Sequence, residues 1–191
     1  MTAAIVLAAG RGTRFGGGKM LAEINGRPML QHVLDLAAHT ELDPVVVVLG
    51  EDADAIEAAT AWRRELRVRN DDPGRGISSS LKLGLEALGD SDRVLILLGD
   101  QPNLTVGQLR QIVDAGRASR PITVPRYRGR PGNPVLLERS VWSMAGALDG
   151  DRGMSQLFSA NSPLVWYVDV DGDNPDVDTE ADLAALSRDG G

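Results

Sequence analysis

The sequence predicts an α/β fold, a three-layer αβα sandwich around a mostly parallel, Rossmann-like sheet. Short apolar runs typical of strands buried on both faces occur at residues 3–8, 45–49 and 94–98. Segments with helical periodicity separate these runs, and strands alternate with helices four times in the first part of the chain. Because successive parallel strands need a crossover, usually a helix, this alternation predicts helices on both faces of one sheet.

The predicted elements are regular in the first part of the chain and less regular in the second. In the first part we expect strands at residues 3–8, 45–49, 66–69 and 94–98, and helices at residues 28–39, 51–62, 78–88 and 105–118. In the second part we expect strands at residues 122–127, 133–137 and 164–170, and helices at residues 139–148, 154–159 and 179–187. We see no internal repeat, low-complexity segment or long linker, so a single domain over residues 1–191 is the simplest organisation.

Composition and charge argue against several classes of protein. The 191 residues carry a formal net charge of -7, which argues against a nucleic-acid partner, because non-specific nucleic-acid binding depends on a basic surface. The chain has no cysteine, which excludes disulfides, thiolate metal sites and cysteine nucleophiles. The apolar runs are far shorter than the ~20 residues that span a bilayer, and no basic segment precedes the first of them. We therefore expect no membrane segment, no signal peptide and a cytoplasmic location.

A glycine-rich loop follows the first predicted strand and is the main candidate for chemistry. Residues 10–19 contain five glycines together with Arg11, Arg14 and Lys19. Glycines let backbone N–H groups approach phosphate oxygens, and cationic side chains neutralise their charge. The alternative, a flexible surface turn, does not explain three cations inside one glycine run. The loop therefore predicts a site for a phosphorylated ligand.

Two common phosphate motifs do not match this loop. The P-loop needs a glycine where Thr13 stands and a hydroxyl side chain where Met20 stands. The dinucleotide fingerprint needs its third glycine where Phe15 stands, one residue before the next glycine of the loop. These mismatches indicate a different kind of phosphate loop.

Asp100 stands just beyond the strand predicted at residues 94–98. A carboxylate there can cap the next helix or hold a divalent cation, and Thr105 is the better placed helix cap. Mg²⁺ takes one or two protein carboxylates and completes its shell with phosphates and water, so Asp100 is a candidate Mg²⁺ ligand. Ligands of open parallel sheets bind beyond the carboxyl ends of the strands. The glycine loop, residues 70–80 and Asp100 all follow such ends, and we expect them on one rim.

Asn70 and the serine run at residues 78–80 are weaker candidates, for contacts with a ribose or a base edge. The alternative for Ser78 is a helix N-cap. His32 and His39 both lie on the first predicted helix and are interpreted as structural. The sequence pattern shows no Ser-His-Asp arrangement, zinc spacing or close carboxylate pair. Chemistry without a general base fits attack by a phosphate, largely dianionic at neutral pH, on an activated phosphate.

These motifs, in this order, resemble the MobA-like nucleotidyltransferase family, and within it the molybdenum cofactor cytidylyltransferases. The resemblance extends over nearly the whole chain. Its blocks are residues 7–16 with Lys19, Asn70 with Gly76, Ser80-Leu81 and Gly84, residues 98–102, residues 129–136, residues 150–153, and residues 176–179 with Asp182-Leu183. It implies a fold of the nucleotide-diphospho-sugar transferase type, with residues 1–120 as the nucleotide-binding half and residues 121–191 as the acceptor-binding half.

The resemblance also implies an activity. Enzymes of this subgroup transfer CMP from CTP to the terminal phosphate of molybdopterin and release pyrophosphate. The implied partners are CTP or another NTP, Mg²⁺, a phosphorylated acceptor such as molybdopterin, and a molybdenum hydroxylase as client. The alternative for Asp178 is a plain helix-end carboxylate. The implied site residues are Arg14, Lys19 and Asp100 for catalysis; Leu7, Ala8, Ala9, Gly10, Arg11, Gly12, Thr13, Asn70, Ser79 and Ser80 for the nucleotide; Asp100 and Asp178 for the metal; and Gly132, Asn133 and Asp151 for the acceptor.

Individual positions refine this resemblance. Guanylyl-transferring relatives usually carry a second glycine where this chain has Ala9, and a methyl group there leaves less room for a purine, which suits cytosine. Asn133 stands where the subgroup often has histidine, Glu180-Ala181 where a proline-glutamate pair is usual, and Met154-Ser155 where a small and then a basic residue are common. All three departures lie in the acceptor-binding half, so the acceptor stays open.

Several other activities stay open at this point. Within the enzyme class they are guanylyl transfer from GTP to the same cofactor, and cytidylyl or uridylyl transfer to a sugar or polyol phosphate. Outside it they are an NAD(P)H-dependent oxidoreductase and a non-catalytic maturation partner that holds the molybdenum cofactor. Binding of NAD(P)H without CTP would favour the first of these two, and molybdopterin binding without metal-dependent turnover would favour the second.

Overall fold

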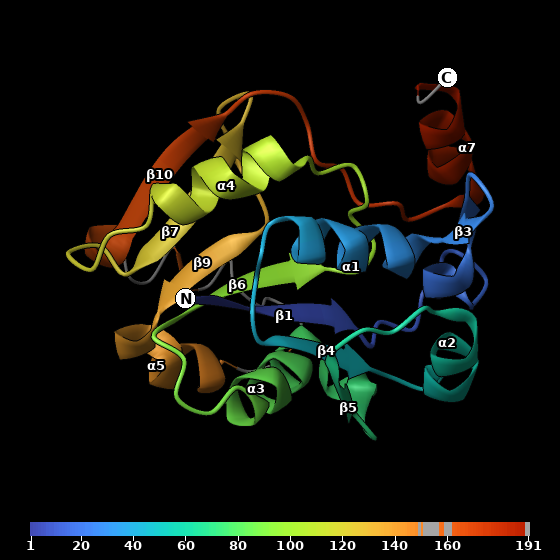
Figure 1. Ribbon diagram of the computed structural model, residues 1–191, viewed down its shortest axis with the longest axis horizontal. Helices are drawn as coiled ribbons and strands as arrows, with labels where there is room; N and C mark the ends of the chain where they lie inside the picture. The colour runs from blue at the N-terminus through green and yellow to red at the C-terminus, as the bar shows by residue number, and fades with distance from the viewer. Residues whose placement is uncertain (149, 151–156, 159–161, 190–191) are drawn as a thin grey trace.

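A mixed sheet of eight strands lies at the centre of the part of the chain that the computed structural model describes, residues 1–148, 150, 157–158 and 162–189. Seven strands follow the order β10-β7-β9-β6-β1-β4-β5, and β8 pairs with β7 (Figure 1). Their bounds are β1 (Thr2–Ala8), β4 (Val45–Leu49), β5 (Leu66–Arg69), β6 (Arg93–Leu98), β7 (Ile122–Tyr127), β8 (Arg130–Pro131), β9 (Val135–Glu138) and β10 (Val165–Val170).

The strands on one side of the sheet all run in the same direction. β1 pairs in parallel with β4 and with β6, and β4 pairs in parallel with β5. β9 runs antiparallel to both β6 and β7, whereas β10 is parallel to β7. The mostly parallel sheet expected from the sequence is therefore confirmed, with β9 as an antiparallel insertion.

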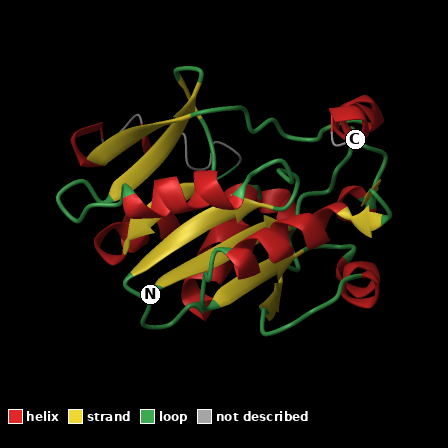
Figure 2. Cartoon of the chain, turned by 45° about the horizontal axis from the view of Figure 1, so that its top comes forward, coloured by secondary structure: helices red, strands yellow, loops and turns green. Residues whose placement is uncertain are grey.

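Helices cover both faces of the sheet, which confirms the three-layer architecture. α1 (Met29–His39) and α4 (Val106–Asp114) lie on one face, and α3 (Ile77–Ala87) and α5 (Trp142–Gly146) lie on the other (Figure 1). The view in Figure 2 again places helices on both sides of the strands. The apolar residues of β1 with even numbers join one core cluster and those with odd numbers join the other. A strand packed on both faces must be apolar throughout, which explains the sequence of β1.

The end of the described chain returns to its beginning. α7 (Glu180–Asp189) lies beside the short hairpin of β2 (Glu23–Ile24) and β3 (Arg27–Pro28), at the right of Figure 1. Val177 is buried there with Ile24 and Met29, and Phe15 packs against the same cluster. Residues near the end of the described chain are thereby held against the glycine loop.

Several helices are shorter than the sequence pattern predicts. The helix expected at 51–62 is α2 (Ala53–Ala59), because the backbone of Thr60 is extended and the indole of Trp62 folds back to donate to the Glu57 carbonyl at 3.0 Å. The helix expected at 105–118 ends at Asp114, and Thr105 caps it as expected. The remaining short turns are η1 (Lys19–Leu21), η2 (Pro73–Arg75), η3 (Arg139–Val141), which precedes α5, and η4 (Ser162–Leu164). Of the helix expected at 154–159, residues 157–158 are described and helical, and the rest lies outside the described residues.

Candidate active site

The carboxyl ends of the parallel strands meet on one rim of the sheet. β1 leads there into the glycine loop, β5 into Asn70, and β6 into Asp100. A cavity of about 210 Å³ opens on this rim. Its lining comes from three separate stretches of the chain: Leu7, Ala9, Gly10, Met20, Pro73, Gly76, Ile77, Ser80, Leu98 and Asp100. The fold therefore brings the three stretches together as the sequence analysis expects.

A second cavity, of about 160 Å³, adjoins the glycine loop and shares Ala9, Gly10 and Met20 with the first. Arg11 and Lys19 also line it. Ala9, a predicted nucleotide-binding residue, therefore belongs to both cavities.

The glycines keep the loop tight around these cavities. The Gly12 carbonyl accepts hydrogen bonds from the Phe15 and Gly17 amides, at 2.9 and 3.2 Å. Gly12 has a φ of +53°, and a Cβ there would lie 2.9 Å from the Cβ of Lys19. At the end of β4, a Cβ on Gly50 would lie 2.6 Å from the Ala9 carbonyl oxygen. Any larger side chain at these two glycines would push the loop away from Lys19 or from β4.

An ion cluster fills the centre of the rim. The Lys19 ammonium donates to Asp100 Oδ2 at 2.6 Å and to Asp178 Oδ1 at 2.8 Å, and its side chain is only 7% exposed. Arg14 Nη1 donates to the other oxygen of Asp178, Oδ2, at 3.0 Å, from a largely exposed position. Two carboxylates and two cations thus converge from β6, the glycine loop and the segment before α7. The sequence pattern shows no close carboxylate pair, but the fold joins Asp100 and Asp178 through one ammonium.

The cluster shifts the pKa values of its members. Burial alone would lower the pKa of Lys19, but the hydrogen bonds to Asp100 and Asp178 outweigh it, so this pKa lies above its usual value of 10.5. The hydrogen bond from Lys19 holds the pKa of Asp178 below its usual value, and the charge of Arg14 adds to this effect. Both side chains are therefore charged around neutral pH.

Asn70 organises the rim from within. Its buried Nδ2 donates to Ser79 Oγ and Ser80 Oγ, both at 2.9 Å, and its Oδ1 accepts from the Asp72 amide at 3.0 Å. Every polar hydrogen of the amide is therefore used inside the protein. Asn70 holds the first turn of α3 against the end of β5, and Ser80 lines the larger cavity. The N-cap of α3 is Gly76, so the alternative that Ser78 caps this helix is wrong.

A buried polar network joins the rim to the second half of the chain. Gln101 Nε2 donates to Asp176 Oδ1 at 2.6 Å, and Gln101 Oε1 accepts from Asn174 Nδ2 at 3.0 Å. Asn174 Nδ2 also donates to the Asn133 carbonyl at 2.9 Å, which accepts from the Tyr127 hydroxyl at 3.0 Å. The Val177 amide donates to the Asp100 carbonyl at 3.0 Å, and Asp178 follows directly. We call Gln101 with Asn174 the amide clasp.

Sequence reasoning missed the amide clasp. Gln101 belongs to the block at residues 98–102, but only as part of a resemblance, and Asn174 lies in a turn-forming run that carries no chemical signal. Burial and the charge of Asp100 raise the pKa of the neighbouring Asp176, against the hydrogen bond from Gln101. The clasp and Asp176 fix the path of the strap, residues 171–178, that brings Asp178 to Lys19.

Of the three predicted acceptor residues, the structure describes Gly132 and Asn133. Asn133 is tied to the rim through Asn174, and Gly132 donates its amide to the Pro125 carbonyl at 3.0 Å. A Cβ on Gly132 would lie 3.0 Å from the ring of Tyr127, so glycine lets the backbone pass this ring. Asp151 lies outside the described residues. The acceptor roles of these residues stay predictions.

The remaining predicted residues also fall on or near the rim. Thr13 lies in the loop, where its carbonyl accepts from the Gly16 amide at 3.3 Å. Arg11 forms an ion pair with Glu51 at 2.6 Å, but both side chains are more than half exposed, so this pair contributes little to stability. Ala8 lines the smaller cavity. His32 and His39 bond to backbone carbonyls of Ile24 and Asp35, in line with a structural role.

The donor set at the rim fits a hard divalent cation. Asp100 and Asp178 direct oxygens at one point, which Lys19 Nζ occupies. Within residues 1–148, 150, 157–158 and 162–189, no group of three or more histidine, aspartate or glutamate side chains could hold a metal by itself. Two carboxylates with phosphate oxygens of a substrate are a common ligand set for Mg²⁺. The arrangement can therefore hold a cation together with a polyphosphate.

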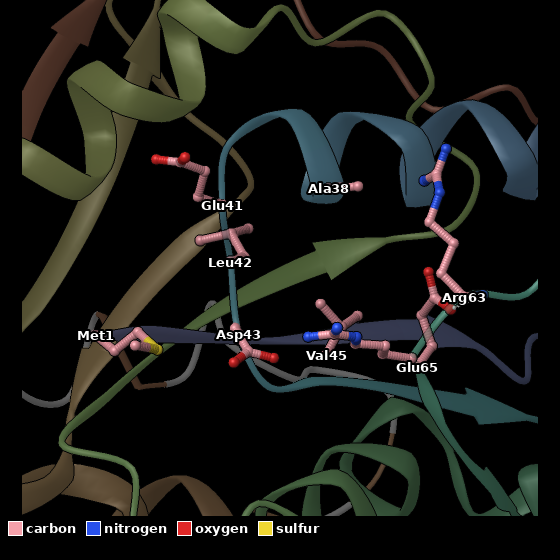
Figure 3. Close-up of a pocket in the computed structure, with 9 residues that line it drawn as sticks. Met1, Ala38, Glu41, Leu42, Asp43, Val45, Arg63 and Glu65 are labelled. Carbon is pink, nitrogen blue, oxygen red and sulfur yellow. Dashed lines mark hydrogen bonds between the residues drawn. The ribbon is translucent and has the colours of Figure 1, made fainter.

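A third cavity lies at the opposite end of the parallel strands and shares no lining residue with the two rim cavities. It has a volume of about 590 Å³, and its lining includes Met1 before β1 and Val45 at the start of β4 (Figure 3). Carboxylates and arginines such as Asp43 and Arg63 surround an apolar floor formed by Leu42 and Val45. None of the predicted site residues lines it, so size alone does not mark the active site.

Comparison with known proteins identifies a family. Residues 4–164 match the family model described as the MobA-like NTP transferase domain. The bifunctional protein GlmU of Sphingopyxis alaskensis is 39% identical over 155 residues, which are 78% of this chain and 32% of that protein. The chain thus spans about a third of the length of this curated relative.

Solved structures resemble the chain over its whole length. Rv0371c from Mycobacterium tuberculosis H37Rv superimposes with a TM-score of 0.90 at 34% identity, over 98% of this chain and 97% of that one. Rv0371C in complex with manganese, from the same organism, gives a TM-score of 0.86 at 32% identity and the same coverage. Among the described residues, no helix is long and apolar enough to cross a membrane.

Proposed function

The chain belongs to the MobA-like NTP transferase family, and from this premise we propose that it transfers CMP from CTP to the terminal phosphate of molybdopterin, with release of pyrophosphate. The observation that carries the nucleotidyl-transfer part is the Lys19 cluster beside the glycine loop. Both cations and both carboxylates needed for a metal-bound triphosphate converge there. None of the described residues that line the two rim cavities is a histidine, and a dianionic phosphate acceptor needs no general base.

Cations and backbone amides of the glycine loop hold the triphosphate in this proposal. The amides of residues 9–13 face the phosphates, while Arg14 and Lys19 neutralise their charge. Catalysis by such a site is mainly positioning and charge stabilisation, because the attacking group already carries its charge. Leu7 and Gly10 line the rim cavity of about 210 Å³, next to the loop.

The base and ribose occupy the rim cavity of about 210 Å³ in this proposal. Ala9 lies beside the base and its methyl favours a pyrimidine, while Ala8 contacts the nucleotide from the smaller cavity. Ser80 offers its hydroxyl to the ligand in this cavity, whereas Ser79 lines a separate cavity and donates its hydroxyl to the Gly76 carbonyl at 2.8 Å. Asn70 holds both serines in place.

Asp100 and Asp178 hold Mg²⁺ or Mn²⁺ in this proposal. The bound cation neutralises charge on the phosphate oxygens during transfer. A divalent ion is supported by the manganese complex of the relative that is 32% identical over nearly its whole length.

The acceptor side carries the weaker part of the proposal. Gly132, Asn133 and Asp151 are the candidate contacts for molybdopterin, and a molybdenum hydroxylase is the candidate client. Asn133 departs from the histidine of the cytidylyltransferase pattern. This departure favours a second candidate, transfer of a cytidylyl or uridylyl group to a sugar or polyol phosphate. GTP as the donor is the remaining variant.

A binding panel followed by a transfer assay tests this proposal. Thermal unfolding is followed with Mg²⁺ and each of the four NTPs, and with NADPH; a nucleotide at 100 Kd should add ~2.7 kcal/mol of stability. Pyrophosphate release is then measured with molybdopterin, a sugar phosphate and a polyol phosphate as acceptors.

Two pairs of variants complete the test. Asp100→Ala and Lys19→Ala should each lose most of the transfer, whereas the exposed controls Asp173→Ala and Lys82→Ala should keep it. Activity of both site variants close to that of the wild type would refute nucleotidyl transfer at this rim. Turnover with sugar phosphate alone would replace molybdopterin as the acceptor.

A further inference from the structure

Lys19 occupies the point on which the two candidate metal ligands converge. Among the described residues, its ammonium donates hydrogen bonds to Asp100 Oδ2 at 2.6 Å and to Asp178 Oδ1 at 2.8 Å. A divalent cation held by both carboxylates would compete with this ammonium for the same oxygens. The side chain is 7% exposed, so water does not screen this contact well.

We propose that Lys19 holds the place of the divalent cation in the nucleotide-free protein and is displaced from both carboxylates when the metal and the triphosphate bind. The inference rests on the proposed function, because it takes the rim as the site of a metal-bound NTP. It assigns Lys19 a second role in addition to contact with the triphosphate. Before substrate arrives, its ammonium positions Asp100 and Asp178 for the metal.

The charges at the rim favour displacement of the Lys19 ammonium by the metal over binding of the metal beside it. Asp100 and Asp178 carry two negative charges, and Lys19 with Arg14 carries two positive ones, so the nucleotide-free cluster is neutral. A bare divalent cation would enter beside an ammonium that already satisfies both carboxylates. A metal-bound triphosphate brings negative phosphate oxygens that can take over the displaced ammonium. The cluster therefore opposes the bare metal and admits the metal together with nucleotide.

The smaller cavity beside the glycine loop gives the Lys19 side chain space to move into. Lys19 and Arg11 line the smaller cavity beside the glycine loop, and Lys19 lies against Gly12 at the base of that loop. Arg14 contacts the other oxygen of Asp178 and does not occupy the point between the carboxylates. Displacement of the ammonium from the carboxylates toward the loop therefore moves it toward the phosphates without losing a charged partner.

Metal binding in the absence of nucleotide tests the inference without any activity readout. Mn²⁺ affinity is measured by isothermal titration calorimetry and by electron paramagnetic resonance for wild type, Lys19→Gln and Arg14→Gln. Each variant removes one positive charge from the cluster, but only Lys19→Gln vacates the point between the carboxylates. We expect Lys19→Gln to bind Mn²⁺ at least about fivefold more tightly than wild type, and Arg14→Gln to gain less.

Two results would overturn the inference. One is a Lys19→Gln affinity equal to that of wild type, or a gain no larger than that of Arg14→Gln, which would leave only a general charge effect. The other is a gain that survives in the Lys19→Gln/Asp100→Asn double variant, because the metal would then bind elsewhere.

A measurement on the wild type covers the case in which Lys19→Gln fails to fold. The ¹⁵N signal of the Lys19 ammonium is followed by NMR with Mg²⁺ alone, with a non-hydrolysable CTP analogue alone, and with both. The inference expects a large shift only with both, and an unchanged signal under all conditions contradicts it. Failure here is separate from failure of the proposed function, because pyrophosphate release by the wild type is measured independently.

Discussion

The two halves of the sheet reach the active site by different routes. On one side, β1, β4, β5 and β6 are parallel, so the loop that follows each strand lies on the same rim. On the other side, β9 runs antiparallel to its neighbours, and the strap, residues 171–178, has to cross back to the rim. The topology of parallel strands alone brings the loops that follow them together on one rim. Where a strand is antiparallel, as β9 is, contacts at the rim depend on the later loops and their side chains.

We expect the largest effect from a substitution of Asp178, because this residue of the strap contacts Lys19 and Arg14 of the glycine loop. Asp178→Asn removes a candidate metal ligand and a partner of Lys19, so we expect pyrophosphate release to fall on the order of a hundredfold. The matched control is Asp173→Asn, an exposed carboxylate of the same strap that pairs with Arg128 at 3.3 Å. Titration of Mg²⁺ in a steady-state assay should show the loss in Asp178→Asn and normal behaviour in the control. Equal activity in both variants would mean that the strap contributes no residue to catalysis at the rim.

Asn70 tests the nucleotide half on its own. Asn70→Ala removes three hydrogen bonds and leaves the Asp72 amide without its side-chain acceptor. We expect a loss of about 1–3 kcal/mol in the free energy of unfolding, together with a higher KM for the NTP, because the first turn of α3 is released. Urea denaturation and nucleotide titration measure the two effects. The exposed Asn103→Ala should stay within about 0.5 kcal/mol of wild type, and a similarly small change in Asn70→Ala would contradict the bracing role.

The sequence predicts the parallel half well for a physical reason. Strands buried on both faces must be continuously apolar, so β1, β4 and β6 stand out, and the loops after them are placed by topology alone. The early end of α2 could not be predicted from the sequence, because the amphipathic pattern of this segment continues past Thr60. Local periodicity does not include the turn that Trp62 makes against Glu57.

The candidate site is predictable only where it depends on strand ends. The glycine loop and Asp100 follow from that rule. The contact of Lys19 with Asp178 joins residues 159 positions apart, and no local pattern encodes it. Only the resemblance to a family points to Asp178, and nothing in the sequence points to Asn174. The internal use of the Asn70 amide likewise depends on how α3 docks.

The amide clasp tests the connection between the halves. Asn174→Ala removes the bonds to Gln101 and to the Asn133 carbonyl, and Tyr127→Phe removes the other bond to that carbonyl. We expect Asn174→Ala to lower the free energy of unfolding by about 0.5–1.5 kcal/mol. The double variant should lose more than the sum, because only then is the shared carbonyl left without either donor. A urea double-mutant cycle measures the coupling, and strictly additive losses would argue against a shared carbonyl.

The pH dependence of stability gives the smallest expected effect. The pKa of Asp178 is lowered in the folded protein, so its contribution is present above its usual 3.8 and is lost as the pH falls through the lowered value. The pKa of Lys19 is raised, so its contribution is complete below 10.5 and is lost as the pH rises through the raised value. Because Asp178 is partly exposed, solvent reduces its share.

Chemical denaturation between pH 2 and 6 checks the acid side. Asp178→Asn should flatten the decline below pH 4, whereas Asp173→Asn should keep the decline of the wild type. An identical acid decline in all three proteins would show that the charges joining the two halves do not contribute to stability.

The long separation of Lys19 and Asp178 also has a consequence during synthesis. The glycine loop leaves the ribosome early, but its ammonium finds its second carboxylate only after 159 further residues have been added. A nascent or truncated chain that ends before the strap can pair its parallel strands and still lacks half of the carboxylate pair. Before that point the Lys19 ammonium can pair with Asp100 alone, and Arg14 lacks the Asp178 carboxylate that it contacts in the folded chain.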